Sequence, residues 1–558
     1  MAKPPADVNY TFSDDELEAL KPYGDVRAHE EGEVLIAEGD QHVDCLITLS
    51  GETHIFVDGR NGPRRLGYME RGQFIGDIGV LTGQAALART TMGKTGDVLH
   101  IPYDRFQKLL VENSALSDIF VRTFTARRAF ALSRDEAPVI VLGSALDRSV
   151  FGLRDFLTRH SIPHSYHDPV TDPLGETIAA AKELNEETLP AVILGAERVL
   201  HRPTVNDLAV ALGLDLLPDG AAADVIVVGA GPAGLAASVY AGSEGLSVLT
   251  LDSAAPGGQA GTSSKIENYL GFPTGVSGQE LADRAAVQAQ KFGVRLAAPV
   301  QVQALTCLGD GTYCVETKDG RKLQGRAVVV ASGAQYRRLS IPNLELFEGA
   351  GVYYGASPLE AQLCGGAEVA IVGAGNSAGQ GAVFLSKSAK AVHVLYRRKD
   401  IRETMSEYLV RRLEETENIH LHPETEIEAF HPHCPESQDP RLAAITIKKP
   451  EKSFKVEAGF VFLFIGAAPF TNWLPDEVAR DPRGFVKTGA DLETLELVRA
   501  GWKLDRMPST YETSLPRIYA VGDVRAGSVK RVASSVGEGS VVVSAVHAAL
   551  SELDRAAE

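Results

Sequence analysis

Two glycine-rich loops carry the residue types and spacing that point most directly to chemistry. The first, residues 229–234 (GAGPAG), follows the apolar run Val225–Val228, and the second, residues 373–378 (GAGNSA), follows Val369–Val372. An apolar strand, a G-x-G-x-x-G/A loop and a helix start form a dinucleotide-binding site, because the glycines permit a tight turn and the helix N-terminus faces the pyrophosphate. Two such sites in one chain predict a flavin that exchanges electrons with a nicotinamide.

The residues that end the following strand distinguish the two sites. Asp252 lies about 20 residues beyond the first loop, where a carboxylate accepts a hydrogen bond from the adenosine ribose, so the first site predicts FAD. The strand after the second loop, Ala391–Tyr396, ends in arginines, which favour the 2′-phosphate of NADPH through charge-assisted contacts. A solvated basic turn is the alternative. The predicted NADPH residues are Gly373, Gly375, Asn376, Ser377, Ala378, Arg397, Arg398 and Arg402.

The cysteines predict no second redox centre and no metal site. There are five, they are scattered along the chain, and no C-x-x-C occurs. This spacing disfavours a disulfide framework and a zinc site, so most of the thiols are expected to be buried and inert. The cysteines are Cys45, Cys307, Cys314, Cys364 and Cys434.

Several domains must position these residues, because 558 residues exceed a single core. The net charge of −18 disfavours a general nucleic-acid binder or a protein bound to an anionic membrane. The N-terminal segment has no apolar stretch, and no later apolar run is expected to span a bilayer. The expected location is therefore the cytoplasm.

Residues 1–135 predict a β-barrel or jelly roll that closes with a helix over Leu116–Leu132, because short strands alternate with Gly-centred turns. No DNA-binding helix-turn-helix follows. The segment 76–83 (GDIGVLTG) and the Arg-Thr pair after it resemble the cyclic-nucleotide-binding domain of catabolite-activator-type regulators, although Asp77 replaces that family's Glu. The alternative is a degenerate barrel used for dimerisation or docking. The resemblance implies that a cyclic nucleotide contacts Gly76, Asp77, Arg89 and Thr90.

Residues 138–217 resemble a glutaredoxin-like thioredoxin fold, with Pro190 at the position of its cis-proline. The catalytic C-x-x-C should follow the first strand, where the sequence is Gly143 to Asp147 (GSALD). Without a thiolate there is no disulfide exchange, so we expect a redox-inactive adaptor or, alternatively, a binding site for a small thiol or a protein. The expected elements are strands over Val139–Leu142, His164–His167 and Ala191–Leu194, and helices over Val150–His160, Thr177–Leu184 and Val205–Leu212.

The rest of the chain resembles low-molecular-weight thioredoxin reductase. The motifs that carry the resemblance are GAGPAG, GGQ (257–259), ENYLGFP (267–273), ASGA (331–334), GAGNSA, the RR-x3-R arginines and GDV (522–524). The resemblance implies two Rossmann-like α/β domains, with an FAD domain in two parts, 222–338 and 469–558, around an NADPH domain, 339–468. It also implies a homodimer and a rotation of one domain against the other. The implied FAD residues are Gly229, Gly231, Pro232, Ala233, Gly234, Asp252, Gly258, Gln259, Asn268, Ala331, Gly333, Gly522 and Asp523.

One departure from this family bears on mechanism. Its redox cysteines should follow Tyr354, where the sequence is Gly355 to Pro358 (GASP), and the nearest thiol is Cys364. We therefore predict an NADPH-dependent flavin oxidoreductase that passes electrons to a ferredoxin-like protein, a quinone or dioxygen, under control of a cyclic nucleotide. The alternatives are a thioredoxin-disulfide reductase that uses Cys364 or partner thiols, and a nucleotide- and redox-sensing signalling protein without turnover.

Overall fold

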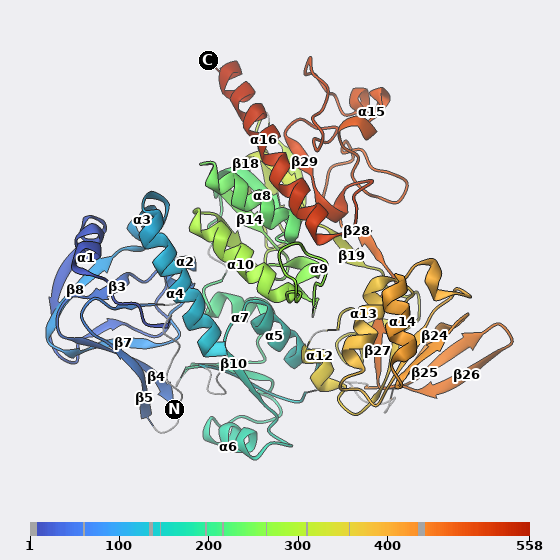
Figure 1. Cartoon of the computed structure of the whole chain (residues 1–558), viewed down its shortest axis with the longest axis horizontal. Coiled ribbons are helices and arrows are strands. Elements are labelled where there is room, and N and C mark those ends of the chain that lie inside the picture. Colours follow the sequence, from blue (N-terminus) through green and yellow to red (C-terminus); the bar gives the residue numbers. More distant parts are fainter. Residues whose placement is uncertain are drawn as a thin grey trace.

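The computed structural model describes residues 8–59, 62–76, 78–132, 138–145, 147–195, 198–214, 217–263, 265–308, 311–356, 358–432 and 441–557. Figure 1 shows the first domain in blue at one end and the predicted NADPH domain in orange at the other. Between them lie the second domain, in teal, and the green and red parts of the predicted FAD domain.

The first domain is a β-roll built from short antiparallel strands, consistent with the all-β architecture predicted from its Gly-centred turns. Two four-stranded sheets, in the orders β1-β8-β3-β6 and β2-β7-β4-β5, face each other with antiparallel pairing throughout. An aromatic cluster of Phe12, Phe74, Phe106, Phe120 and Phe124 joins the roll to its C-terminal helix. The elements are α1 (Asp14–Leu20), β1 (Asp25–His29), β2 (Val34–Ile36), β3 (Cys45–Thr48), β4 (Glu52–Gly59), β5 (Gly62–Met69), β6 (Phe74–Ile75), α2 (Ile78–Thr82), β7 (Arg89–Lys94), β8 (Gly96–Ile101), α3 (Tyr103–Glu112) and α4 (Ser114–Leu132).

The second domain is a four-stranded sheet in the order β10-β9-β11-β12, in which β10 is parallel and β11 antiparallel to β9. The three predicted strands are present, and the Leu189–Pro190 peptide bond is cis as predicted. Our expectation missed β12, a four-residue edge strand whose end residues are exposed, so it has no apolar run to reveal it. The elements are β9 (Val139–Leu142), α5 (Arg148–Arg159), β10 (His164–His167), α6 (Pro173–Ala181), β11 (Ala191–Leu194), β12 (Arg198–His201) and α7 (Val205–Ala211).

The predicted FAD domain is built on a seven-stranded sheet that two separated stretches of chain complete. Its strands follow the order β15-β14-β13-β18-β17-β16, and β29, from near the C-terminus, pairs in parallel with β18. The elements are β13 (Ala222–Val228), α8 (Pro232–Ser243), β14 (Val248–Leu251), α9 (Gly258–Gly261), α10 (Gly278–Lys291), β15 (Arg295–Ala297), β16 (Val302–Cys307), β17 (Tyr313–Thr317), β18 (Lys322–Val330), α15 (Thr494–Arg499), β29 (Ile518–Ala520) and α16 (Val532–Ala557).

The predicted NADPH domain contains a parallel five-stranded sheet, β20-β27-β21-β22-β23, and an antiparallel three-stranded sheet, β24-β25-β26. The chain enters and leaves it through a paired two-stranded segment, β19 (Ala334–Tyr336) with β28 (Ala467–Pro469). The elements are α11 (Leu344–Phe347), β20 (Val352–Tyr353), α12 (Pro358–Leu363), β21 (Glu368–Val372), α13 (Asn376–Leu385), β22 (Ala391–Leu395), α14 (Glu407–Glu415), β23 (Ile419–His422), β24 (Glu426–Pro432), β25 (Leu442–Lys449), β26 (Lys452–Glu457) and β27 (Phe460–Leu463).

One apolar segment corrects the expectation that no run could span a bilayer. Val532–Arg555 of α16 has the length and composition to cross a membrane, with a mean hydropathy of 1.2. Its Val542, Val543 and Val546 are buried in one apolar cluster with Ala237 of α8. These contacts pack one face of α16 against the predicted FAD domain. The run was overlooked because serine, glycine and glutamate interrupt it.

The aromatic cluster of the first domain generates a stability prediction. Phe120→Ala removes a fully buried ring in contact with Phe74 and Phe106, and should cost about 3–5 kcal/mol of unfolding free energy. The measurement is thermal or urea unfolding of the full chain. Val111→Ala on α3, where the side chain is 62% exposed, is the control and should change stability little. Equal unfolding midpoints for the two variants would contradict the prediction.

Candidate cofactor sites

The first glycine loop has the close backbone approaches that exclude side chains. Gly229 has a φ of +109°, and a Cβ atom there would lie 2.2 Å from the carbonyl oxygen of Ala331. A Cβ atom at Gly234 would lie 1.8 Å from the carbonyl oxygen of Gly229. Gly231 is the N-cap of α8 and Pro232 begins the helix, so the free N–H groups of the first turn are available to an anion.

Two further segments meet this loop. A Cβ atom at Gly258 would lie 3.1 Å from Cα of Gly231, and one at Gly522 would lie 2.8 Å from Cβ of Ala233. The GGQ and GDV motifs therefore converge on the first loop, although more than 250 residues separate them from each other in the chain. Gln259 donates to the carbonyl oxygen of Ala334, the residue after Gly333 in the segment that follows β18.

Asp252 fixes the backbone around this site. Its Oδ2 accepts from the N–H of Ala230 at 2.8 Å, and its Oδ1 accepts from those of Ala254 and Ala255 at 2.9 and 3.1 Å. Burial raises the pKa of this carboxyl, whereas the backbone N–H groups and the nearby Arg159 lower it. The carboxylate thus links the first loop to the 254–258 segment.

The other two predicted FAD residues differ in their surroundings. Asp523 is largely buried, burial raises its pKa, and the ammonium of Lys530 donates to its backbone carbonyl. The neighbouring Gly522 N–H donates to Glu538 Oε2 at 2.7 Å. Asn268 instead lies exposed in the loop between Ile266 and Val276, and the structure does not bring its side chain to the other predicted residues.

The second glycine loop repeats the design of the first. Gly373 has a φ of +147°, and a Cβ atom there would lie 2.4 Å from the carbonyl oxygen of Phe464. Gly375 caps α13; Asn376 and Ser377 are exposed in its first turn, and Ala378 is buried.

Sequence analysis missed two residues that hold this second loop. Thr404 Oγ1 donates to the carbonyl oxygen of Ala374 at 2.8 Å, and the N–H of Ser406 donates to Asn376 Oδ1 at 2.8 Å. The available signal was their position directly after the arginine pattern.

The three predicted arginines follow β22 on the surface. The side chain of Arg397 is 82% exposed and lies 3.8 Å from Glu426. Arg398 pairs with Glu403, and Arg402 pairs with Glu414 at 2.7 Å. Surface pairs of this kind contribute little and exchange readily, so an incoming phosphate can replace the carboxylates.

The segment where the resembled family carries its thiols lies next to the C-terminal end of α9. A Cβ atom at Gly355 would lie 3.6 Å from Oγ1 of Thr262, the residue that follows α9. Ser357 lies outside the described residues. Cys364 is fully buried after α12, and burial raises its pKa to about 11. This thiol is therefore neutral at pH 7 and belongs to the apolar core of the predicted NADPH domain.

The predicted cyclic-nucleotide residues lie where β6, α2 and β7 meet. Gly76 has a φ of +126° and precedes α2, whereas Asp77 lies outside the described residues. Arg89 begins β7 with its guanidinium 5.7 Å from the ring centre of Phe56, and Thr90 is 2% exposed. Sequence analysis missed Arg127 of α4, which donates to the carbonyl oxygen of Gly76 at 2.6 Å.

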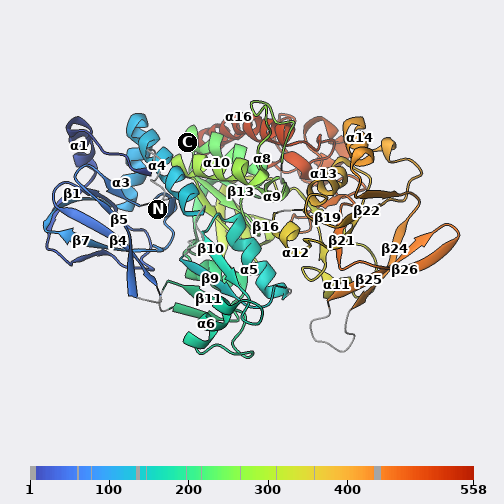
Figure 2. The ribbon, with the colours of Figure 1, turned by 60° about the horizontal axis from the view of Figure 1, so that its bottom comes forward.

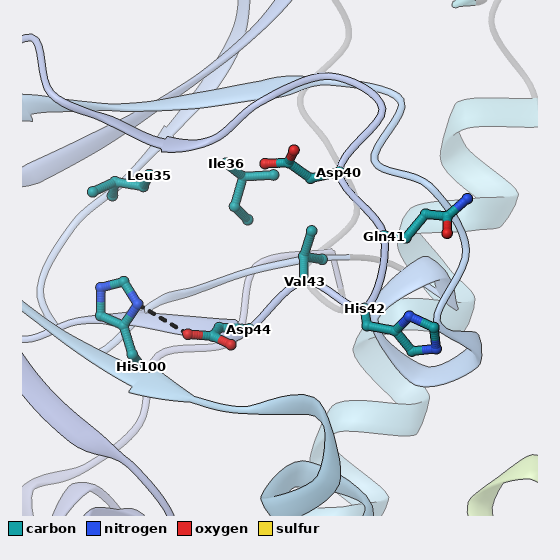
Figure 3. Close-up of a pocket in the computed structure, with 8 residues that line it drawn as sticks. All are labelled: Leu35, Ile36, Asp40, Gln41, His42, Val43, Asp44 and His100. Atoms are coloured by element: carbon teal, nitrogen blue, oxygen red, sulfur yellow. Dashed lines mark hydrogen bonds and ion pairs between the residues drawn. The ribbon is translucent and has the colours of Figure 1, made fainter. Parts of the chain in front are cut away.

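A separate cavity of about 250 Å³ opens beside the β2–β3 connection of the first domain. Figure 3 shows Asp44 turned toward His100, whose Nδ1 lies 3.2 Å from its Oδ2. Neither Gly76, Arg89 nor Thr90 lines this cavity, so it is distinct from the predicted nucleotide site.

Comparisons with known proteins match the two outer parts of the chain. Residues 223–539 match the family model described as pyridine nucleotide-disulphide oxidoreductase, and residues 26–113 match that of the cyclic nucleotide-binding domain. The thioredoxin reductase of Treponema pallidum is 30% identical over 335 residues, which cover 59% of this chain and 97% of that protein. The thioredoxin reductase of Bacillus subtilis is 29% identical over 331 residues, covering 59% and 95%.

A solved structure shows the same similarity to thioredoxin reductases. The thioredoxin reductase of T. acidophilum has a TM-score of 0.51 and 26% identity, and the match covers 59% of this chain and 98% of that one. Residues 138–217 lie outside both family-model matches.

The exposed arginines generate a specificity prediction. Replacing Arg397 and Arg398 together with Ala should raise the KM for NADPH tenfold or more and leave that for NADH nearly unchanged, because only NADPH carries the 2′-phosphate. The readout is steady-state kinetics with both nucleotides. The double variant Arg411→Ala/Arg412→Ala removes two exposed charges from α14 and is the matched control. An unchanged NADPH preference in the first variant would refute the assignment.

Proposed function

The chain belongs to the pyridine nucleotide-disulphide oxidoreductase family, and from this premise we propose that it oxidises NADPH and passes the electrons to an acceptor other than a disulfide. One observation carries the proposal: both nucleotide loops are formed, but Gly355 to Pro358 replace the thiol pair of the resembled reductases beside Thr262.

The chain's residues have separate tasks in this proposal. The first loop and the N-terminus of α8 bind the diphosphate of FAD, and Asp252 binds its adenosine ribose. The second loop and the arginines after β22 bind NADPH. FAD supplies the hydride and electron transfer when bound, and the protein supplies binding, orientation and exclusion of water.

The acceptor is proposed to be a ferredoxin-like protein, a quinone or dioxygen. The relatives named above are thioredoxin reductases, and disulfide reduction through Cys364 or through partner thiols is the competing function. The buried, neutral thiol of Cys364 favours the first proposal over a route through that residue, because a thiolate is the nucleophile of disulfide exchange. A homodimer in the cytoplasm remains a prediction.

We propose that the second domain is a thioredoxin-like adaptor without thiols. Its sheet order and strand directions support this proposal. At the N-terminal end of α5, Arg148 donates to the carbonyl oxygen of Glu345, and the ring of Phe151 lies 5.3 Å from that of Tyr353. Figures 1 and 2 both show α5 next to α12 of the NADPH domain and below α9 and α10 of the FAD domain. An element in this place can bias the relative position of the two domains.

Contacts between the first domain and the FAD domain support regulation by a cyclic nucleotide. The residue that holds Gly76, Arg127, lies on α4, and Asp118 of the same helix pairs with Lys291 of α10 at 2.8 Å. Val287 of α10 packs against the first domain's core, and α10 contacts α2 directly. A ligand that binds two arrangements of these helices with different affinity would change turnover.

The absent thiol pair generates an activity prediction. The purified protein should oxidise NADPH with a quinone or an artificial acceptor and show no thioredoxin-coupled disulfide reduction. Cys364→Ser should retain the acceptor activity, as should the control Cys307→Ser, which replaces an exposed thiol. Native protein should be alkylated by iodoacetamide at Cys307 before Cys364, because burial raises the Cys364 pKa. Thioredoxin-coupled turnover, whether lost or kept in Cys364→Ser, would overturn the proposal.

The predicted cyclic-nucleotide site generates a binding prediction. Calorimetric titration with cyclic AMP and cyclic GMP should detect binding of one of them, and Arg89→Ala should raise its Kd by about 10- to 100-fold, the size of a charge-assisted contact. NADPH oxidation measured with and without that nucleotide tests coupling. Arg27→Ala, an exposed position on β1, is the control. If neither nucleotide binds, or if Arg89→Ala binds as the parent does, the domain serves docking or dimerisation instead.

A further inference from the structure

The C-terminal end of α5 docks on the part of the FAD domain that carries the predicted cofactor residues. His160 Nε2 lies 3.0 Å from the carbonyl oxygen of Ala254, and Gln279 donates to the carbonyl oxygen of Arg159 at 2.9 Å. Ser161 donates to Asp283 at 2.5 Å. The second domain therefore contacts the 254–258 segment and α10 from outside the FAD domain.

His160 contributes a fixed hydrogen bond to this contact. Burial lowers its pKa to about 4, so the imidazole is neutral at pH 7. A neutral ring beside a carbonyl oxygen carries its proton on the facing nitrogen, so Nε2–H donates to Ala254. Since the N–H of Ala254 donates to Asp252, the second domain stabilises the same backbone as that carboxylate.

Arg159 has hydrogen-bonding capacity that the described part of the chain leaves unused. Its Nη2 donates to the carbonyl oxygen of Gly258 at 3.4 Å, which is a long bond, and its Nη1 is 4.0 Å from Asp155, too far for one. Its Nε is buried and has no hydrogen-bond partner within the described ranges of the chain. The side chain is 17% exposed. A guanidinium has five N–H donors, and a buried donor without a partner is costly.

The place of this guanidinium indicates what could satisfy it. Gly258 is the residue whose Cα closely approaches Gly231, at the N-terminus of α8. The charge of Arg159 also reaches Asp252, whose pKa it lowers. A cation thus lies at the junction of the first loop, the GGQ motif and the predicted ribose acid, where a dinucleotide presents its diphosphate.

We propose that Arg159 is a cofactor-binding residue supplied by the second domain, whose guanidinium binds the diphosphate of the dinucleotide in the first loop. The observation that carries the inference is the guanidinium held at the carbonyl of Gly258, with a buried Nε that has no partner among the described residues. This inference rests on the proposed binding of FAD. Arginine can bind a diphosphate in this way because its planar guanidinium donates two parallel hydrogen bonds to two phosphate oxygens. The second domain then completes the flavin site in addition to bridging the two nucleotide domains.

FAD affinity tests this inference directly. Flavin is removed from the full-length protein, and the Kd for added FAD is measured from the change in flavin fluorescence. Arg159→Ala should raise this Kd by about 10- to 100-fold and weaken its dependence on salt, since a charged contact to phosphate is lost. Arg159→Lys keeps the positive charge but lacks the planar guanidinium, so its Kd for FAD should be intermediate. This variant also tests the inference if Arg159→Ala fails to fold.

Three controls separate cofactor binding from domain docking. Ser161→Ala and Gln279→Ala each remove a docking contact at the same interface, and Arg148→Ala removes a charge at the other end of α5. All three should leave the FAD Kd within about threefold of the parent. An unchanged Kd in Arg159→Ala, or an equal loss in Ser161→Ala and Gln279→Ala, would overturn the inference. A parent protein that binds no FAD would instead refute the proposed function itself.

Discussion

The partly buried carboxylate of Asp252 is the interaction on which the predicted nucleotide site depends. Burying a carboxylate is expensive unless hydrogen bonds replace its water, and here three backbone N–H groups do so. Those N–H groups belong to the first loop and to the 254–258 segment, so one side chain fixes both. The segment in turn presents the carbonyls of Ala254 and Gly258 to the second domain. The proposed cofactor site and the domain interface are therefore one continuous structure.

Contiguous contacts connect the first and second domains to the predicted nucleotide domains. The first domain reaches the FAD domain through α4 and α10, and the second domain reaches both nucleotide domains through the two ends of α5. Contiguity alone is not coupling, because coupling needs two arrangements that a ligand distinguishes. The short β19–β28 pair is the covalent connection between the nucleotide domains, and it leaves their relative position to be set by contacts such as those of Phe151 with Tyr353.

Local features of the sequence predicted the loops, the strands before them and the β-roll, because glycine spacing and apolar runs encode these within a few residues. The residues that sequence analysis missed are held by tertiary contacts. Arg127, Thr404 and Arg159 donate to backbone carbonyls that are distant in the chain, and no local pattern marks them. The N–H of Ser406 likewise donates to the distant side chain of Asn376. Edge strand β12 lacked an apolar run, and α16 was misjudged because polar residues interrupt a helix that packs on α8.

The central claim is that this chain couples NADPH to a flavin without a redox-active pair of thiols. An anaerobic titration of the purified flavoprotein with NADPH, followed by flavin absorption, tests it most directly. A flavin alone accepts two electrons, whereas a flavin with a redox disulfide accepts four. The account predicts complete bleaching at one NADPH per flavin. An endpoint at two NADPH per flavin would reveal a second redox centre and contradict it, and a flavin that NADPH fails to bleach would contradict the assignment as an NADPH oxidoreductase.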